Sequence, residues 1–466
     1  MREEMQMEKI IFDVDSYKVS HAPQYPPETT SMFSYVESRG GLYPNVVFFG
    51  LHYILRTALG TPVTHDDVSE ATKFYAAHGE PFNEEGWRHI VNAHGGFMPV
   101  RIRALAEGSV VPVHTPLVTV ESLDPKVFWA ASWIETALMR LWYPTNVATI
   151  GYHIRKTLKA FLELSSDDPT AEIDFKLHDF GSRGVSSRES AEIGGMAHLV
   201  NFNGSDTVVG VRAAGKYYDA GVCGFSIPAA EHSSITSWGQ EHEADAYRNM
   251  LDKFAKPGSL VAVVSDSYDI YAACEHIWGG ELRERVISSG ATVVIRPDSG
   301  EPREVVLKCV EILAKKFGYT TNSKGFKVLN NVRVIQGDGV NHESIRGILD
   351  RLAINGWSAS NVAFGMGGAL LQGHNRDTQR FAMKCSSVTV NGEERDVFKS
   401  PVGDPTKYSM RGRLDVESFE GKVRTAVLRD GAEKVPYSIM REVYNAGNLS
   451  AADSFDIIRA RARKGQ

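Results

Sequence analysis

The chain has 466 residues, of which 42% are hydrophobic and 23% are charged, and its formal net charge at pH 7 is -6. A chain of this length can bury a large core and suits two or three domains or one elaborated α/β unit. The composition is that of an ordinary globular protein, and the negative charge argues against a general nucleic-acid binder.

Targeting and redox signals favour a cytoplasmic protein. The first twenty residues carry acidic side chains before a short apolar run, which is wrong for a secretory signal, and no apolar stretch approaches the ~20 residues of a membrane span. We therefore expect no membrane partner. Scattered cysteines without CxxC spacing predict neither a disulfide framework nor a zinc site: Cys223, Cys274, Cys309 and Cys385.

The first third of the chain has a mixed pattern. Helical periodicity occupies residues 48–59, and strand-like alternation occupies residues 98–122. Within it, residues 108–122 predict strands broken by Pro112 and Pro116. A long apolar helix is predicted for residues 127–142. This mixture predicts neither an all-helical nor an all-strand domain.

A regular series of short β-type runs begins at Phe175. Each run is followed by a Gly-rich or charged loop, and helix-like segments fit between several of them at a spacing of about 25 to 40 residues, as in βα units. Polar residues collect where the runs end, as expected at the mouth of a parallel sheet. The runs lie within residues 175–184, 199–206, 224–234, 259–269, 291–300, 332–340 and 361–371.

This series predicts an α/β fold with an irregular, incomplete barrel. We assign residues 171–384 to the barrel, a span somewhat shorter than the ~250 residues of an eight-unit barrel. Residues 1–170 together with 385–466 are assigned to an additional mixed α/β domain, in which a β-hairpin is expected around Asn391-Gly392.

Two glycine loops suit a phosphate group. Ile335–Val340 and Phe364–Leu371 each follow an apolar run, and the second leads into a helix-like start. Glycines let backbone N–H groups approach an anion at the positive end of a helix. Tight turns that use glycine only for backbone geometry are the alternative for either loop.

Charged side chains end two other runs, at Asp266 and at the pair Arg296 and Asp298. Carboxylates in such places can accept hydrogen bonds from vicinal sugar hydroxyls or hold Mg²⁺, and a neighbouring guanidinium balances their charge. Asp266 also suits a helix N-cap, because Asp followed by Ser before a helical pattern is a common start signal.

Glu231 and His232 stand side by side among small residues. Imidazole titrates near neutral pH and a carboxylate can orient one ring nitrogen, so the pair suits a general base or a nucleophile that accepts a phosphoryl group. A core histidine satisfied by the backbone is the alternative. Basic residues outside the series are, taken singly, typical of a solvated face: Arg39, Arg376, Lys384, Lys399 and Lys407.

Several segments carry a family resemblance over nearly the whole chain: DSYKVSHAPQYPPETTSMFSYVESRG, KLHDFGSRGVSS, AHLVNFNGSDTV, PAAEHSSIT, VVSDSYDIY, IRPDSGEP, VIQGDGV, AFGMGGALLQ and FKSPVGDPTKYSMRGRL. In this order they resemble the nicotinamide phosphoribosyltransferase family of type II phosphoribosyltransferases. The resemblance implies homodimers with composite active sites. It also implies a reaction of nicotinamide with 5-phosphoribosyl 1-pyrophosphate to give nicotinamide mononucleotide and pyrophosphate, in NAD salvage.

The resemblance implies an aromatic sandwich for the pyridine ring, with Phe180 on one face and Tyr17 of the partner subunit on the other. Asp206 would accept a hydrogen bond from the carboxamide and repel the carboxylate of nicotinate. Arg296 would help to hold the carboxamide, and His178 would support the pocket wall.

Further roles follow from the same resemblance. Asp298 would bind the ribose hydroxyls, and Arg183 would face the pyrophosphate together with Mg²⁺, whose ligands are not identified. Four loop residues would cradle the 5′-phosphate: Gly337, Asp338, Gly367 and Gly368. The basic set would close over the phosphates, in part across the dimer interface.

The resemblance also makes His232 the histidine that ATP phosphorylates, with Glu231 beside it and Asp266 as the acid that orients it. ATP hydrolysis would then be coupled, non-obligatorily, to tighter substrate binding. Bond formation itself needs little acid–base help, because the neutral pyridine nitrogen already has its lone pair.

Three residues depart from some members of the family and are expected to alter pocket width or affinity: Ser182, Ala262 and Met366. Two other functions stay open. One is nicotinate phosphoribosyltransferase, which Asp206 disfavours, and the other is a catalytically silent nucleotide-binding protein on the same fold.

Overall fold

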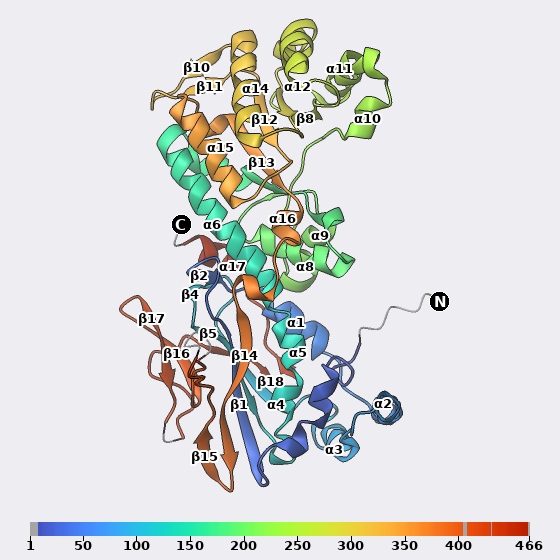
Figure 1. Cartoon of the computed structure of the whole chain (residues 1–466), viewed down its shortest axis with the longest axis vertical. Helices are drawn as coiled ribbons and strands as arrows, with labels where there is room; N and C mark the ends of the chain where they lie inside the picture. Colours follow the sequence, from blue (N-terminus) through green and yellow to red (C-terminus); the bar gives the residue numbers. More distant parts are fainter. Residues whose placement is uncertain (1–7, 404–407, 430, 465–466) are drawn as a thin grey trace. The chain divides into compact units, whose positions relative to one another are not determined.

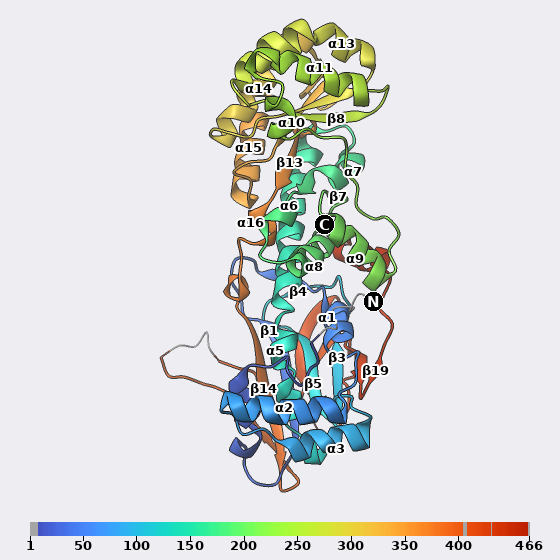
Figure 2. The same cartoon turned by 90° about the vertical axis from the view of Figure 1, so that its right-hand side faces the viewer.

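The computed structural model describes residues 8–403, 408–429 and 431–464, which form two compact units (Figures 1 and 2). Packing divides the chain near residues 149 and 374, whereas the sequence pattern places the domain boundaries at 170 and 384. Unit 1 holds the residues up to Thr149, residues 217–219 and those from Asn375 on, and unit 2 holds Ile150–Lys216 and Ala220–His374.

Unit 2 is built on a six-stranded sheet in which every neighbouring pair is parallel. Its interior strands are short and mostly buried, and two of them, β9 and β12, are rich in valine and isoleucine, as expected where helices cover a parallel sheet. The order across the sheet is β7 (Gly204–Ser205), β6 (Leu177–Asp179), β13 (Val362–Met366), β12 (Val332–Gln336), β9 (Thr292–Arg296) and β8 (Leu260–Val264).

Residues 225–230 connect the two edges of this sheet. At β7 the Ser205 amide donates to the Phe225 carbonyl at 2.9 Å, and at β8 the Ala262 amide donates to the Pro228 carbonyl at 3.0 Å. Both contacts are parallel bridges and not full strands. The sheet therefore curls into the irregular α/β barrel that the sequence predicts, with one predicted strand reduced to two bridges.

Helices follow most of these strands, and their starts carry the expected signals. Glu301 caps α14 with Pro302 at its first position, and Asn341 accepts the Ser344 amide at the start of α15. The helices are α7 (Pro169–Glu172), α8 (Arg188–Leu199), α9 (Val208–Tyr218), α10 (His232–Thr236), α11 (Glu243–Phe254), α12 (Ile270–Ala272), the π-helix η7 (Ala273–Glu281), α13 (Arg283–Ser289), α14 (Pro302–Phe317), α15 (His342–Ile354) and α16 (Gly368–Leu371).

Unit 1 contains a seven-stranded antiparallel sheet. The predicted hairpin is confirmed, because Val390 pairs with Glu393 across the Asn391-Gly392 turn, both of whose residues have positive φ. The order is β15 (Glu393–Asp396), β14 (Phe381–Val390), β1 (Thr29–Ser38), β5 (Pro116–Ser122), β3 (Val100–Ala104), β18 (Arg441–Asn445) and β19 (Asn448–Leu449).

Smaller elements complete unit 1. Two further strand pairs form, and α2 and α3 lie side by side (Figures 1 and 2). These elements are β2 (Asn45–Val47) with β4 (Val110–Pro112), β16 (Leu414–Phe419) with β17 (Lys422–Val427), α1 (Leu51–Ala58), α2 (His65–His78), α3 (Glu84–His94) and α17 (Phe455–Arg463).

The prediction of one long helix over residues 127–142 is wrong. The segment breaks into η3 (Pro125–Val127), α4 (Ala130–Trp133) and α5 (Glu135–Met139), and a long helix, α6 (Trp142–Ser165), starts at its last residue. The apolar character of residues 127–142 reflects burial in an aromatic cluster, in which the Trp87 and Trp133 rings lie 5.0 Å apart. Within the described ranges, no helix combines the length and apolar character needed to cross a membrane.

Candidate active site

The strands of unit 2 end at one edge of the sheet, where the predicted site residues follow them. Because parallel strands run in one direction, their carboxyl ends meet at that edge. Phe180 follows β6, Asp206 follows β7 and Asp266 follows β8. Arg296 and Asp298 lie at the end of β9, Gly337 and Asp338 after β12, and Gly367 and Gly368 after β13.

The Phe180 ring occupies space that only glycines leave open. A Cβ on Gly365 would lie 1.9 Å from Cε2 of Phe180. A Cβ on Gly337 would lie 3.0 Å from Oδ1 of Asp298, 3.6 Å from Cδ of Arg296 and 3.7 Å from Cε2 of Phe180. The structure thus brings the aromatic face, the guanidinium and the carboxylate together around Gly337.

A cavity of about 820 Å³ occupies the interior of the barrel, a size typical of small-molecule sites. Phe180, Asp206 and Arg296 line it at the strand ends, and its wall includes the side chains of Ala262 and Ile335. The Nε of Arg296 is buried without a hydrogen-bond acceptor among the described residues. The same Nε lies 3.6 Å from Oδ1 of Asp298, so the two side chains form an ion pair. The cavity therefore combines apolar walls with a few charged groups at the strand ends, as small-molecule sites commonly do.

Two titratable residues of β6 have shifted pKa values, the partly buried His178 and the fully buried Asp179. Burial lowers the pKa of His178 to about 4, so its imidazole is neutral at pH 7. Burial also raises the pKa of Asp179 to about 6, although the Gly181 amide donates to its Oδ1 at 2.7 Å. A Cβ on Gly204 would lie 2.7 Å from the His178 ring, so glycine is needed for that ring to pack. These contacts fit the expected supporting role of His178.

Asp206 is an exposed carboxylate at the cavity wall. Its amide donates to the Asp179 carbonyl at 3.0 Å, which ties its backbone to the end of β6. Its Oδ1 accepts a hydrogen bond of 2.5 Å from the Ser226 hydroxyl in the segment that joins the sheet edges. The backbone of Asp206 is therefore fixed by one contact and its carboxylate is oriented by the other, and an ionised carboxylate can accept further hydrogen bonds.

His232 lies in contact with Asp266. Its Nε2 is 3.0 Å from Oδ1 of Asp266, and the two side chains are 46% and 5% exposed. The imidazole is therefore open to solvent while its partner is buried, unlike a core histidine. Asp266 is not an N-cap, because Asp269 caps α12 by accepting from the Tyr271 amide.

The loops after β6 and β13 pack on each other. The Phe180 amide donates to the carbonyl of Met366 at 3.0 Å. A Cβ on Gly368 would meet no atom within 4 Å, and Gly368 lies beside Gly184 in η5 (Ser182–Gly184). Arg183 is exposed on η5. The space next to Gly368 is therefore open, and its role as a phosphate loop stays a prediction.

Four of the five basic residues gather in unit 1. Burial lowers the pKa of Lys384, and Arg39, Lys399 and Arg376 lower it further, while Glu135 opposes them. A cluster of neighbouring cations creates a positive potential that attracts anions. The fifth residue, Lys407, lies outside the described residues, and Tyr17 is 57% exposed on η1 (Ser16–Ser20).

Several residues of the site carry no signal in the sequence. Ser226, which donates to Asp206, lies in a stretch of small residues without a recognisable motif. Gly365, which leaves space for the Phe180 ring, is a glycine within a strand that no pattern marks as functional. At the far end of the cavity, Lys176 pairs with Glu172 at 2.9 Å. The curl of the sheet brings Ser226, Lys176 and Glu172 to one cavity. No local pattern in the sequence indicates this.

The curled parallel sheet of unit 2 and the accompanying mixed α/β unit have the fold of type II phosphoribosyltransferases. Two solved structures resemble the whole chain: nicotinate-nucleotide pyrophosphorylase from Pyrococcus furiosus, with a TM-score of 0.62, 15% identity and coverage of 98% and 95% of the two chains, and human nicotinic acid phosphoribosyltransferase, with a TM-score of 0.56, 17% identity and coverage of 97% and 92%. These similarities concern the fold.

Sequence comparison gives the family. A nicotinamide phosphoribosyltransferase of Xanthomonas campestris pv. campestris is 54% identical over 98% of both chains, and one of Acinetobacter baylyi is 30% identical over 96% of both. Residues 9–102 match the nicotinamide phosphoribosyltransferase N-terminal domain, and residues 175–445 match the nicotinate phosphoribosyltransferase (NAPRTase) family. The chain belongs to the nicotinate phosphoribosyltransferase family.

Proposed function

We propose that the chain transfers the phosphoribosyl group of 5-phosphoribosyl 1-pyrophosphate to nicotinamide, in NAD salvage in the cytoplasm. The observation that carries the proposal is the convergence of Phe180, Asp206 and Arg296 on one cavity. The relatives at 54% and 30% identity, both named nicotinamide phosphoribosyltransferase, support the same choice. In the reaction, the bond from ribose C1′ to pyridine nitrogen forms as the bond from C1′ to pyrophosphate oxygen breaks.

Selection of the amide rests on Asp206. A carboxamide N–H₂ can donate to its carboxylate, whereas the carboxylate of nicotinate would face a like charge at close range. Arg296 could bind either substrate through their carbonyl or carboxylate oxygen. The Ser226 hydroxyl keeps Asp206 oriented. The difference between the two substrates therefore depends on one carboxylate.

Sugar and phosphate binding is assigned to the other strand ends. Asp298 is proposed to accept hydrogen bonds from the ribose hydroxyls, since it lies beside Phe180 and Arg296 around Gly337. Backbone N–H groups of two glycine loops are proposed to hold the 5′-phosphate. The loop residues are Gly337, Asp338, Gly367 and Gly368.

Mg²⁺ is proposed to enter with the pyrophosphate. The ion keeps several waters and binds proteins through one or two carboxylates plus substrate phosphates, so a complete protein cage is not required. Asp298 and Asp338, which follow the neighbouring strands β9 and β12, are the carboxylates proposed to supply this contact. When bound, Mg²⁺ would neutralise charge on the leaving pyrophosphate, and Arg183 would add a guanidinium on the same side.

ATP coupling is proposed to run through His232. If Asp266 accepts from Nε2–H at the observed 3.0 Å, the Nδ1 atom keeps its lone pair and can attack the γ-phosphorus of ATP. The N–P bond forms as the bond to the ADP oxygen breaks, and water later hydrolyses the phosphohistidine. Glu231 stands beside this imidazole as the first residue before α10.

A homodimer completes the proposal. The family resemblance assigns the second face of the pyridine ring to Tyr17 from the partner subunit, and its 57% exposure leaves the ring available. The cationic cluster of unit 1 is proposed to bind phosphate oxygens. Its members are Arg39, Arg376, Lys384 and Lys399, with Lys407 as a fifth expected member.

Product formation tests the proposal directly. Purified protein would be given Mg²⁺ and 5-phosphoribosyl 1-pyrophosphate with nicotinamide or nicotinate, with and without ATP, and mononucleotide and pyrophosphate would be measured. Nicotinamide mononucleotide is the expected product. Product from nicotinate alone would overturn the role of Asp206, and binding of mononucleotide without turnover of either base would support the silent alternative.

A further inference from the structure

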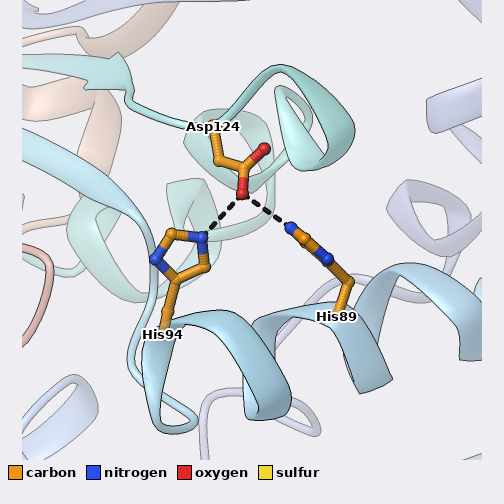
Figure 3. Close-up of side chains that lie close together, drawn as sticks. All are labelled: His89, His94 and Asp124. Atoms are coloured by element: carbon orange, nitrogen blue, oxygen red, sulfur yellow. Dashed lines mark hydrogen bonds and ion pairs between the residues drawn. The ribbon is translucent and has the colours of Figure 1, made fainter.

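Two histidines and an aspartate of unit 1 converge outside the cavity (Figure 3). The Nε2 atoms of His89 and His94 each lie 2.7 Å from the same oxygen, Oδ2 of Asp124. Their ring planes are inclined by 78°, with centroids 5.8 Å apart. The three ligand atoms all lie within 4.8 Å of one another. No other such group of His, Cys, Asp or Glu is found among the described residues.

Local structure holds the three side chains in place. His89 and His94 are five residues apart on α3, and α3 ends at His94, where Gly95 adopts a left-handed conformation with φ of 60°. Asp124 is the N-cap of η3, and its Oδ1 accepts the Lys126 amide at 2.9 Å. Because Oδ1 accepts this backbone hydrogen bond, Oδ2 is the oxygen that faces the imidazoles. The backbone amide of Lys126 therefore fixes the orientation of the carboxylate.

We propose that these three residues bind a divalent transition metal ion of the Zn²⁺ type, with water in the fourth position. Two imidazole nitrogens and one carboxylate oxygen are a donor set that Zn²⁺ prefers. Ligand bonds near 2.1 Å in a tetrahedron place ligand atoms about 3.4 Å apart. The observed N···O separations of 2.7 Å would therefore open by well under 1 Å, which side-chain rotation allows.

The ion can reach this site from solvent. The side chains of His89, His94 and Asp124 are 24%, 22% and 16% exposed, so they are neither sealed in the core nor fully mobile on the surface. For ligation, each imidazole must present an unprotonated Nε2, so a neutral ring carries its proton on Nδ1 and a charged ring releases one. The bound ion would join the end of α3 to the connection between β5 and η3.

Metal titration of the full chain provides the test. Protein stripped with a chelator would be titrated with ZnCl₂ by calorimetry, and with CoCl₂ while visible absorption of tetrahedral Co²⁺ is recorded. Asp124→Asn keeps an oxygen to accept the Lys126 amide but removes the charged ligand, and His94→Ala removes one nitrogen. His78→Ala, at the end of the neighbouring helix α2, is the matched control.

The expected result is one Zn²⁺ per chain, with an affinity at least about 100-fold weaker in His94→Ala and Asp124→Asn but unchanged in His78→Ala. The Co²⁺ absorption should disappear in the same two variants. Circular dichroism and the thermal midpoint of each stripped variant establish that it is folded. Zn²⁺ affinities of wild type and His94→Ala within threefold of each other would overturn the proposal, as would no measurable binding to folded wild type.

Discussion

The carboxyl edge of the unit 2 sheet and the corner between α3 and η3 in unit 1 use the same residue types differently. At the sheet edge, one exposed imidazole, His232, contacts one buried carboxylate, Asp266, at 3.0 Å. At the α3–η3 corner, two imidazoles direct their Nε2 atoms at one oxygen of Asp124. A single pairing leaves a ring nitrogen free to react, whereas convergence of three ligand atoms favours chelation.

A fourth imidazole, that of His178, sharpens this contrast. His178 lies close to Asp206 and Asp179, yet burial lowers its pKa to about 4. Its imidazole is therefore neutral at pH 7 and lines the cavity, whereas the His232 side chain is 46% exposed. The chemistry open to a histidine beside a carboxylate is thus decided by exposure and by how many ligands converge, and less by the presence of the pair.

The largest effect is expected for His232→Ala. Because this imidazole is the proposed phosphoryl acceptor, the variant should lose ATP hydrolysis and ATP stimulation by at least about 100-fold, while product still forms without ATP. Coupled measurement of ADP and mononucleotide checks this. His242→Ala, which removes another exposed histidine paired with an aspartate at 2.8 Å, is the control, and equal loss in both variants would contradict the assignment.

A smaller but more specific change is expected for Asp206→Ser. Loss of the acceptor should lower kcat/KM for nicotinamide by about 10- to 100-fold and admit nicotinate, because the like charge is removed. Ser226→Ala is the matched variant, since it removes the hydroxyl donor but keeps the carboxylate. Kinetics with both bases distinguish them, and an unchanged preference in folded Asp206→Ser would rule out the carboxylate as selector.

Asp266→Asn should have an intermediate effect on ATP hydrolysis alone. The amide keeps an oxygen near Nε2 but loses the charge that stabilises an imidazolium, so we expect a fall of about 10-fold. Phosphohistidine yield after mixing with labelled ATP measures the step. Zn²⁺ affinity should not change in this variant, and a parallel loss of both properties would mean that the two regions are not independent.

The smallest effect is expected on stability, through Asp179→Asn. The pKa of Asp179 is about 6 in the folded chain and near 3.8 when unfolded, so its contribution to stability is present at low pH and is lost as the pH rises to 6. The opposite shift of His178, from 6.5 to about 4, stabilises the folded chain as the pH rises through the same window. Wild type should therefore change little between pH 4.5 and 6.5.

In the Asp179→Asn variant, only the pH dependence that comes from His178 remains. The thermal midpoint of Asp179→Asn should rise relative to wild type between pH 4.5 and 6.5, with about 3 kcal/mol as the ceiling for a two-unit shift. Asn keeps an acceptor for the Gly181 amide. Thermal melts at several pH values measure the difference, and parallel pH curves for the two proteins would show that Asp179 does not titrate in this window.

Local patterns predicted part of the architecture because their causes are local. Glycine and asparagine tolerate positive φ, so the Asn391-Gly392 turn was readable in the sequence. Apolar runs followed by polar loops likewise indicated the strand ends of unit 2. The apolar run at residues 127–142 misled, since apolarity signals burial and the chain reached burial through short helices around Trp87 and Trp133.

The sequence by itself determined which chemistry follows each strand of unit 2, because parallel strands place whatever follows them at one edge. The tertiary structure alone decided how the sheet curls, through two bridges near Phe225 and Ala229, and which side chains then share a cavity. It alone also brought His89 and His94 to Asp124, which is 35 and 30 residues away. Contacts between residues so distant in the chain leave no local periodicity to read.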